Sequence, residues 1–349
     1  VLTLMDFWFL CPKTVLLRAD GELCTGQTTP WECQQCLLNS SHFYHRTQSM
    51  LSPSLQSIFW NGVAHIPALA RLRGARGMAL DIARRKAKME KEIQLPNLIL
   101  SHSSFVQQMF EQAHIAPPIT HLKNGFNLAW LANFQGKHES AVLRIGYMGQ
   151  ITYIKGVHIL IEAFQKANLA ERAHLEIWGD LTSDPAYVQT LRQLIQDPDT
   201  VKLCGRFQRD ELAEVLANID VLVVPSLWYE NAPLVIQEAF AAKTPVIATN
   251  LGGMAELIQH EVNGLLFERG DVNDLTTQLQ RLSDEPGLVK KLQDGIPTVK
   301  TLAEEVTELE ALYERLAVTE ETVPLQNIGF FTQFCKQIVT LFFWLTMLY

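Results

Sequence analysis

The 349-residue sequence predicts an α/β fold made of Rossmann-like, doubly wound domains. From about residue 141 onward, short apolar runs alternate with amphipathic stretches. Apolar runs without polar alternation indicate strands buried on both faces, as in a parallel sheet covered by helices on each side. The composition agrees, because 48% hydrophobic and 19% charged residues are typical of a globular protein rather than a disordered one.

The strand-like runs recur at regular intervals through residues 136–317, where we expect the larger domain. In chain order they are VLRIGYMG, HLEIWG, VKLCG, VLVVPS, PVIATN and GLLF. The helical stretches between them begin near Gly156, Pro185, Asp210, Pro233, Gly253 and Asp271.

Residues 1–135 carry less of this pattern. VLTL and NLILSHSS read as strands, and long helical material lies between them, including roughly residues 46–94. Two or three strands do not make a stable open sheet alone, so we expect an incomplete Rossmann-like domain whose first half is absent from this chain. HLKNGFNLAWL (121–131) has the Asn-Gly turn of a linker into the second domain.

Two glutamates in the second domain carry the most information about function. Glu230 follows the run VLVVPS, and Glu238 lies more than a turn into the helix expected from Pro233. Loops and helix N-termini at the carboxyl end of parallel strands attract anions through unpaired N–H groups. Two acids beside an anion site are favourable if they bind hydroxyl groups, such as those of a sugar and a ribose. The alternative is a pair of solvated glutamates on a surface helix.

The segment PSLWYENAPLVIQEAFAAKTPVIATNLGG (225–253) resembles the E-x7-E motif of retaining glycosyltransferases of the group 1 type (family 4), which have the two-domain GT-B fold. NGFN (124–127), GYMGQITYIKG and ELEALYERLA resemble further segments of that family. The resemblance implies a GT-B fold, with an acceptor-side domain over 1–135 and a nucleotide-sugar donor domain over 136–317. It stops near Ala317.

The resemblance also implies roles for individual residues. Glu230 would hold hydroxyls of the donor sugar, Glu238 would hold the ribose, and Lys155 would neutralise the diphosphate without a metal. Gln150 stands where the family commonly has Arg, and it lacks the charge and the forked geometry of that residue. The full donor-binding set is Gly149, Gln150, Lys155, Gly179, Gly205, Arg206, Phe207, Glu230, Asn231, Ala232, Pro233, Leu234 and Glu238.

Several of these residues have an ordinary structural explanation. Lys155 alone would be a solvated lysine, and Gly179 and Gly205 would be tight turns after strands. Gly252, Gly253 and Glu256 resemble the family's GG…E turn, for which a purely structural role is equally plausible.

The first strand ends in Met5-Asp6, where the resembling family has His-Asp. The family's His faces the donor sugar and can hydrogen-bond a sugar hydroxyl, which a thioether does poorly. The alternative is that Met5 fills core space at a strand end. The catalytic candidates are therefore Glu230, Lys155, Asp6 and the position of Met5, whose identity puts activity in doubt.

Four of the six cysteines, Cys11, Cys24, Cys33 and Cys36, fall within the polar, turn-rich loop of residues 11–36. The final C-x2-C has the spacing of a tetrahedral metal site, so the four are candidates for structural zinc. Reduced, unliganded cysteines are the alternative, and an iron–sulfur cluster is a lesser one. No cofactor is expected for catalysis.

Charge and the chain's end bear on partners and location. A net charge of −8 argues against a nucleic-acid partner, and the cysteine content favours a reduced, cytoplasmic setting. The basic stretch between Arg71 and Glu92 is either a solvated helix face or a patch for an anionic membrane surface or a phosphorylated acceptor. The apolar tail over 318–349 is too interrupted to span a bilayer, but it suits peripheral membrane contact.

We therefore expect a retaining glycosyltransferase that moves a hexose from a nucleotide-diphosphate sugar to a glycan or lipid-linked acceptor. Two alternatives stay open: a non-catalytic or degenerate nucleotide-sugar binder, and a nucleotide-sugar epimerase of the same fold.

Overall fold

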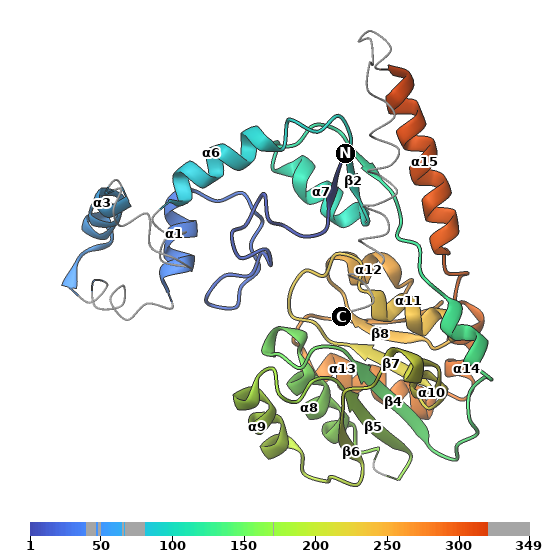
Figure 1. Ribbon diagram of the computed structural model, residues 1–349. Coiled ribbons are helices and arrows are strands. Elements are labelled where there is room, and N and C mark those ends of the chain that lie inside the picture. The colour runs from blue at the N-terminus through green and yellow to red at the C-terminus, as the bar shows by residue number, and fades with distance from the viewer. Residues whose placement is uncertain (40–46, 48–49, 65, 67–80, 170, 320–349) are drawn as a thin grey trace. The chain divides into compact units, whose positions relative to one another are not determined.

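The computed structural model describes residues 1–39, 47, 50–64, 66, 81–169 and 171–319 (Figure 1). Contacts divide the chain into a unit over Val1–Glu305 and a second over Val306–Tyr349. The expected apolar tail lies outside the described residues apart from Val318 and Thr319, as does most of the basic stretch before residue 81. The domain boundaries at residues 135 and 317 stay predictions.

The N-terminal part of the first unit contains a small parallel sheet in the order β1-β2-β3. Its strands are β1 (Leu2–Leu4), β2 (Ile99–Ser101) and β3 (Ile119–His121), and its described helices are α1 (Pro30–Leu38), α3 (Pro53–Ala64), α6 (Ile82–Glu92) and α7 (Ser104–Gln112). The two strands expected from VLTL and NLIL are both present and pair directly, although almost a hundred residues separate them.

The second sheet has six parallel strands in the order β6-β5-β4-β7-β8-β9. They are β4 (Leu143–Met148), β5 (Ala173–Trp178), β6 (Val201–Gly205), β7 (Val221–Val224), β8 (Val246–Thr249) and β9 (Gly264–Phe267). All six expected strands are therefore present. The chain winds outward from β4 in one direction and then returns to continue from β7 in the other. The gap between the ends of β4 and β7 is the point where an open α/β sheet binds its ligand.

Helices cover both faces of this sheet (Figure 1). One layer contains α8 (Val157–Ala167), α9 (Pro185–Leu194), α13 (Val272–Asp284) and α14 (Leu288–Asp294); the other contains α10 (Leu212–Ala217), α11 (Leu234–Ala241) and α12 (Gly252–Leu257). In β7, Val221 and Val223 pack into the first layer, whereas Leu222 and Val224 pack into the second. This alternation explains why the strands read as continuous apolar runs.

The remaining elements are short 3-10 turns and one long helix. The turns are η1 (Ala129–Asn133), η2 (Tyr153–Lys155) and η3 (Arg209–Glu211). Helix α15 (Leu302–Thr319) follows a bridge between Phe126 and Thr301. In the part of the chain with described coordinates, no helix is both long and apolar enough to cross a bilayer.

Candidate active site

The centre of the candidate site is an ion pair between Lys155 and Glu230. The Lys155 Nζ atom lies 2.7 Å from Glu230 Oε1, although the two residues are 75 positions apart in sequence. Lys155 ends the turn η2 after β4, and Glu230 lies in the loop after β7. The sheet order thus brings both side chains to the gap where the winding direction changes.

Glu230 is buried and held from three directions. Besides the Lys155 ammonium, the Ser226 hydroxyl donates to Oε1 over 2.8 Å and the Trp228 indole donates over 3.0 Å. Among the described residues none donates to the other oxygen, Oε2. The carboxylate is therefore fixed in orientation and retains an acceptor for a ligand hydroxyl. The sequence analysis missed Ser226 and Trp228, although both lie within the PSLWYEN segment that identified Glu230.

The loop after β4 is shaped by close backbone approach. The Tyr147 hydroxyl donates to the Gln150 carbonyl oxygen over 2.6 Å, and burial, followed by the charge of Glu230, raises the pKa of Tyr147. The N–H of Gly149 donates to Trp178 O and that of Gly179 donates to Gly205 O. A Cβ at Gly179 would collide with the carbonyl oxygen of Gly149. The close approach of the Gly149 carbonyl oxygen therefore requires glycine at position 179, whether or not a ligand binds there.

Two adjoining pockets contain almost all of the predicted donor-binding residues. The first, of about 420 Å³, is lined by Glu230, Lys155, Gln150 and the segment from Asn231 to Leu234. The second, of about 340 Å³, is lined by Gly179, Arg206, Phe207 and Glu238. Gly149, Leu234 and two neighbouring residues line both, so the pockets meet. Gly205 lines neither pocket.

Cations already engage Glu238, which lines the second pocket, and Asp180, which directly follows Gly179. Arg209 pairs with Glu238, whose side chain is only 14% exposed. Arg206 lies 2.7 Å from Asp180, and hydrogen bonds from the Ser183 hydroxyl and then from Thr182 lower the pKa of Asp180. A ligand at Glu238 would therefore share that carboxylate with Arg209 or displace it.

Met5 and Asp6 line the first pocket together with Glu230. Met5 is 62% exposed, so the expectation that it fills core space is wrong, because most of its surface stays in contact with solvent. The Asn231 side-chain amide donates to the Met5 carbonyl oxygen over 3.0 Å and its oxygen accepts from Ser103. The side chain of Asn231 is thus occupied, and only its backbone is left for a donor.

Gly253 and Glu256 have structural partners. The Gly253 N–H donates to the Glu230 carbonyl oxygen over 3.0 Å, and a Cβ there would overlap with the Asn231 carbonyl oxygen. Glu256 accepts hydrogen bonds from the N–H groups of Ser104 and Phe105, both at 3.0 Å. One glycine therefore keeps the Glu230 loop in place, and the glutamate caps the start of α7.

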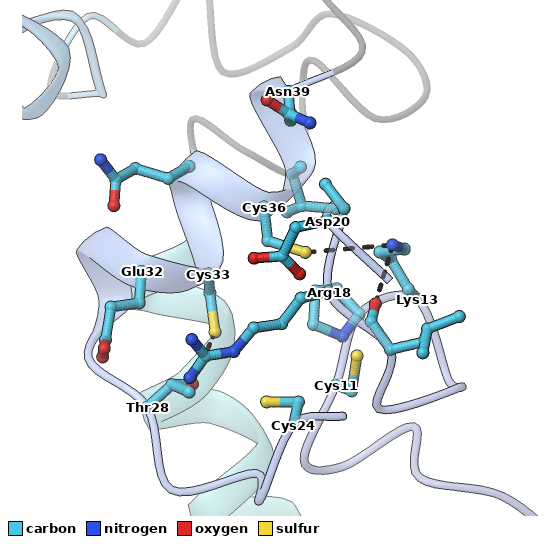
Figure 2. Close-up of a pocket in the computed structure, with 15 residues that line it drawn as sticks. Cys11, Lys13, Arg18, Asp20, Cys24, Thr28, Glu32, Cys33, Cys36 and Asn39 are labelled. Carbon is cyan, nitrogen blue, oxygen red and sulfur yellow. Dashed lines mark hydrogen bonds between the residues drawn. The ribbon is translucent and has the colours of Figure 1, made fainter. Parts of the chain in front are cut away.

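The four N-terminal cysteines line one pocket, which also contains Arg18 (Figure 2). All four are half-buried and free, and burial raises the pKa of the Cys11 and Cys33 thiols. As these side chains stand, no group of three or more Cys, His, Asp or Glu among the described residues has the arrangement of a metal site. Zinc binding by these four cysteines stays a prediction.

Comparison with known proteins finds sequence similarity over the part of the chain that contains the six-stranded sheet. Residues 142–285 match the sequence model described as "Glycosyl transferases group 1". An uncharacterized glycosyltransferase of Methanocaldococcus jannaschii is 34% identical over 148 residues, which are 40% of this chain and 36% of that protein. A D-inositol 3-phosphate glycosyltransferase of Pseudarthrobacter chlorophenolicus is 30% identical over 187 residues, 51% of this chain and 43% of that protein. The chain thus spans less than half the length of these relatives.

Solved structures agree on the architecture. A glycosyltransferase of Rickettsia africae superposes with a TM-score of 0.59 at 18% identity, covering 80% of this chain and 88% of that one. Anabaena HepE in complex with UDP and glucose gives a TM-score of 0.55 at 22% identity, covering 67% of this chain and 66% of that one. Residues 142–285 are thus similar in sequence to the group 1 glycosyl transferases, and the parallel sheets together with the solved structures show that the chain has the GT-B fold.

Proposed function

We propose that this protein transfers a hexose from a nucleoside-diphosphate sugar to a glycan or lipid-linked acceptor, with retention of configuration at the transferred carbon. The observation that carries this proposal is the Lys155–Glu230 pair in a pocket at the switch point of the donor sheet. The UDP and glucose bound by Anabaena HepE support a uridine nucleotide as the first donor to test.

Each part of the site has a distinct task in this proposal. Glu230 accepts a hydroxyl of the donor sugar at Oε2, since Oε1 is already occupied by three donors. The Lys155 ammonium lies beside that carboxylate and stabilises the negative charge that develops on the departing diphosphate. Glu238, in the adjoining pocket, binds the ribose, and the apolar faces of Trp178 and Phe207 border the base. This assignment needs no metal for the transfer step.

The chemistry itself would break the bond between the anomeric carbon and the phosphate oxygen and form a bond to the acceptor oxygen on the same face. The acceptor hydroxyl proton would pass to the departing phosphate, because no described carboxylate besides Glu230 and Asp6 lines the pocket. Glu230 already binds the sugar and the lysine, so it is poorly placed to act as the nucleophile.

The decisive experiment follows nucleotide release from a panel of nucleotide sugars with and without candidate acceptors. Lys155→Ala and Glu230→Gln should each lower kcat at least about a hundredfold, since each removes a charge from the reacting region. Arg172→Ala is the matched control, because Arg172 also makes a 2.7 Å ion pair, with Asp284, but on an exposed surface. Variants of Lys155 and Glu230 with the turnover of the Arg172 control would refute the site.

Met5 favours a second candidate function, that of a protein that binds the nucleotide sugar without transferring it. The residue lines the reacting pocket with a thioether, which neither donates a proton nor accepts a strong hydrogen bond. Saturable binding of the donor without nucleotide release would support this candidate, and an epimerised sugar would indicate the epimerase alternative instead.

A further inference from the structure

The N-terminal segment over residues 7–39 brings four thiol groups together from three separate local structures. Cys11 lies in a turn in which the Thr14 N–H donates to the Cys11 carbonyl oxygen, and Cys24 follows a small hairpin bridged between Leu17 and Leu23. Cys33 and Cys36 occupy the first two turns of α1. Their sulfur atoms surround one pocket of about 370 Å³ (Figure 2). Chance proximity explains a pair of cysteines more readily than four from separate structures.

The local backbone has features that suit thiolate ligands. The N–H of Gly26, two residues after Cys24, donates to the Cys24 sulfur over 3.4 Å. The Thr28 hydroxyl lies 2.9 Å from the Cys33 sulfur, and the Lys13 ammonium lies 3.9 Å from the Cys36 sulfur. Such outer partners orient sulfur ligands and balance their charge. Arg18 also lines the pocket, which adds a second cation.

The hydrophobic clusters around this segment are small, which gives a metal ion a stabilising role. Cys11 and Cys24 pack against the cluster that contains Phe7 and Leu16, whereas Cys33 packs against a separate, small cluster of Leu37, Leu38, Trp60 and Ile82. A few buried side chains stabilise a segment only weakly, and metal ligation is a common way to fix such a segment. Cysteines that line one pocket therefore pack against two different clusters.

We infer that Cys11, Cys24, Cys33 and Cys36 bind one structural Zn²⁺ ion, which fastens the loop of residues 7–28 to helix α1. On binding, four Zn–S bonds form, four S–H bonds break and the thiol protons leave to solvent. The side chains do not already stand in metal geometry, so binding requires rotation of the thiols about their Cα–Cβ bonds. The resulting zinc tetrathiolate carries two negative charges, which Lys13 and Arg18 partly neutralise. None of the four cysteines lines the pocket of the transfer chemistry proposed above, and the ion plays no part in that chemistry.

The experiment measures the metal content of the full chain purified without chelator from zinc-supplemented medium. Elemental analysis should find about one zinc per chain, and reconstitution with Co²⁺ should give the sulfur-to-cobalt charge-transfer and d–d bands of a tetrahedral thiolate site. Cys36→Ser should lower the zinc content at least about tenfold, whereas Cys36→His, which keeps a zinc ligand, should retain it. Cys204→Ser is the control, because Cys204 lies in β6 outside this pocket.

Several results would overturn the inference. Zinc content unchanged by Cys36→Ser would place the metal elsewhere, and iron in place of zinc would indicate a cluster. A wild-type chain that neither retains zinc nor gives the cobalt bands, or that shows disulfides among these cysteines by mass spectrometry, would also refute it. Hydrogen exchange on the wild-type chain provides a second measurement that does not depend on the folding of the Cys36→Ser variant. Chelation should increase exchange over residues 7–39 and leave β4 to β9 unchanged.

Discussion

At the scale of single residues, the candidate site depends on how two charges share one pocket. Lys155 and Glu230 form an ion pair in the absence of a ligand. This pairing avoids the free-energy cost of an isolated charge in a partly buried pocket. Ser226 and Trp228 keep the carboxylate oriented, so a ligand hydroxyl would meet a preset acceptor. Preorganisation of this kind lowers the cost of ordering the site during binding.

Substitution of Met5 tests whether the pocket needs a side chain that forms hydrogen bonds and exchanges protons at this position. Met5→His should raise the rate of nucleotide release at least about tenfold, because an imidazole can hydrogen-bond a sugar hydroxyl and exchange a proton. The Met5 backbone is held by Asn231, so the new side chain would start from a fixed position. Met5→Leu is the control for size, and equal rates for the His and Leu variants would show that the position has no catalytic role.

Gly253 is predicted to be essential for the shape of the Glu230 loop. Gly253→Ala should destabilise the protein by about 1–3 kcal/mol, because the new methyl group would overlap with the Asn231 carbonyl oxygen. Donor binding should weaken as well, since the hydrogen bond from Gly253 to Glu230 would be displaced. Thermal unfolding and donor titration measure the two effects.

Gly62→Ala is the matched control for Gly253. An added Cβ at Gly62, within helix α3, would meet nothing within 4 Å. Alanine there should be neutral or stabilising by up to about 1 kcal/mol. If both alanine variants unfolded at the same temperature as the wild type, the close approach at Gly253 would not be rigid.

At the scale of elements, helix α7 is joined through its N-terminus to helix α12, which packs beside the six-stranded sheet. Glu256 from α12 accepts from the first N–H groups of α7, and Ser103 caps the same turn by accepting from Val106. A carboxylate suits this place because free N–H groups and the helix dipole both favour negative charge. The cap therefore links β2 and α7 to α12, the helix that contains Gly253.

Glu256→Gln should weaken this link. The amide leaves one acceptor where the carboxylate has two and turns an NH₂ group toward the N–H donors of α7, so we expect a loss of about 1–2 kcal/mol. Hydrogen exchange at the start of α7 should rise more than exchange in β4 to β9. Glu139→Gln, at an exposed position, is the control, and equal effects of both substitutions would contradict the capping role.

At the scale of the whole molecule, stability should depend on pH through His158. Burial lowers the pKa of His158, whose Nδ1 lies 2.7 Å from the Tyr187 hydroxyl. The unfolded chain therefore takes up this proton at a higher pH than the folded one does. The contribution to the free energy of unfolding is complete above the unfolded pKa of about 6.5 and is lost as the pH falls below it.

His158→Asn should reduce this acid sensitivity, because the amide oxygen can still accept from Tyr187 without titrating. Denaturant unfolding of both proteins between about pH 5 and pH 7.5 measures the difference in slope. A wild-type slope that the substitution leaves unchanged would assign the acid sensitivity to other groups.

The sequence by itself determined the alternation of buried strands and amphipathic helices in the second domain and the spacing of Glu230 and Glu238. These features depend on neighbours along the chain, which fix periodicity, turns and helix starts. The sequence also placed Lys155 after the first strand of that domain and Met5 at the end of another strand.

Only the tertiary structure decided which of these residues meet. Strand order sets β4 beside β7 and thereby brings Lys155 to Glu230, and the local sequence of either strand does not specify that neighbour. The same holds for Asn231 beside Met5, Glu256 at the start of α7, and the four cysteines around one pocket. Such contacts arise from long-range packing, where loop closure and burial are settled by the whole chain together rather than by any one segment.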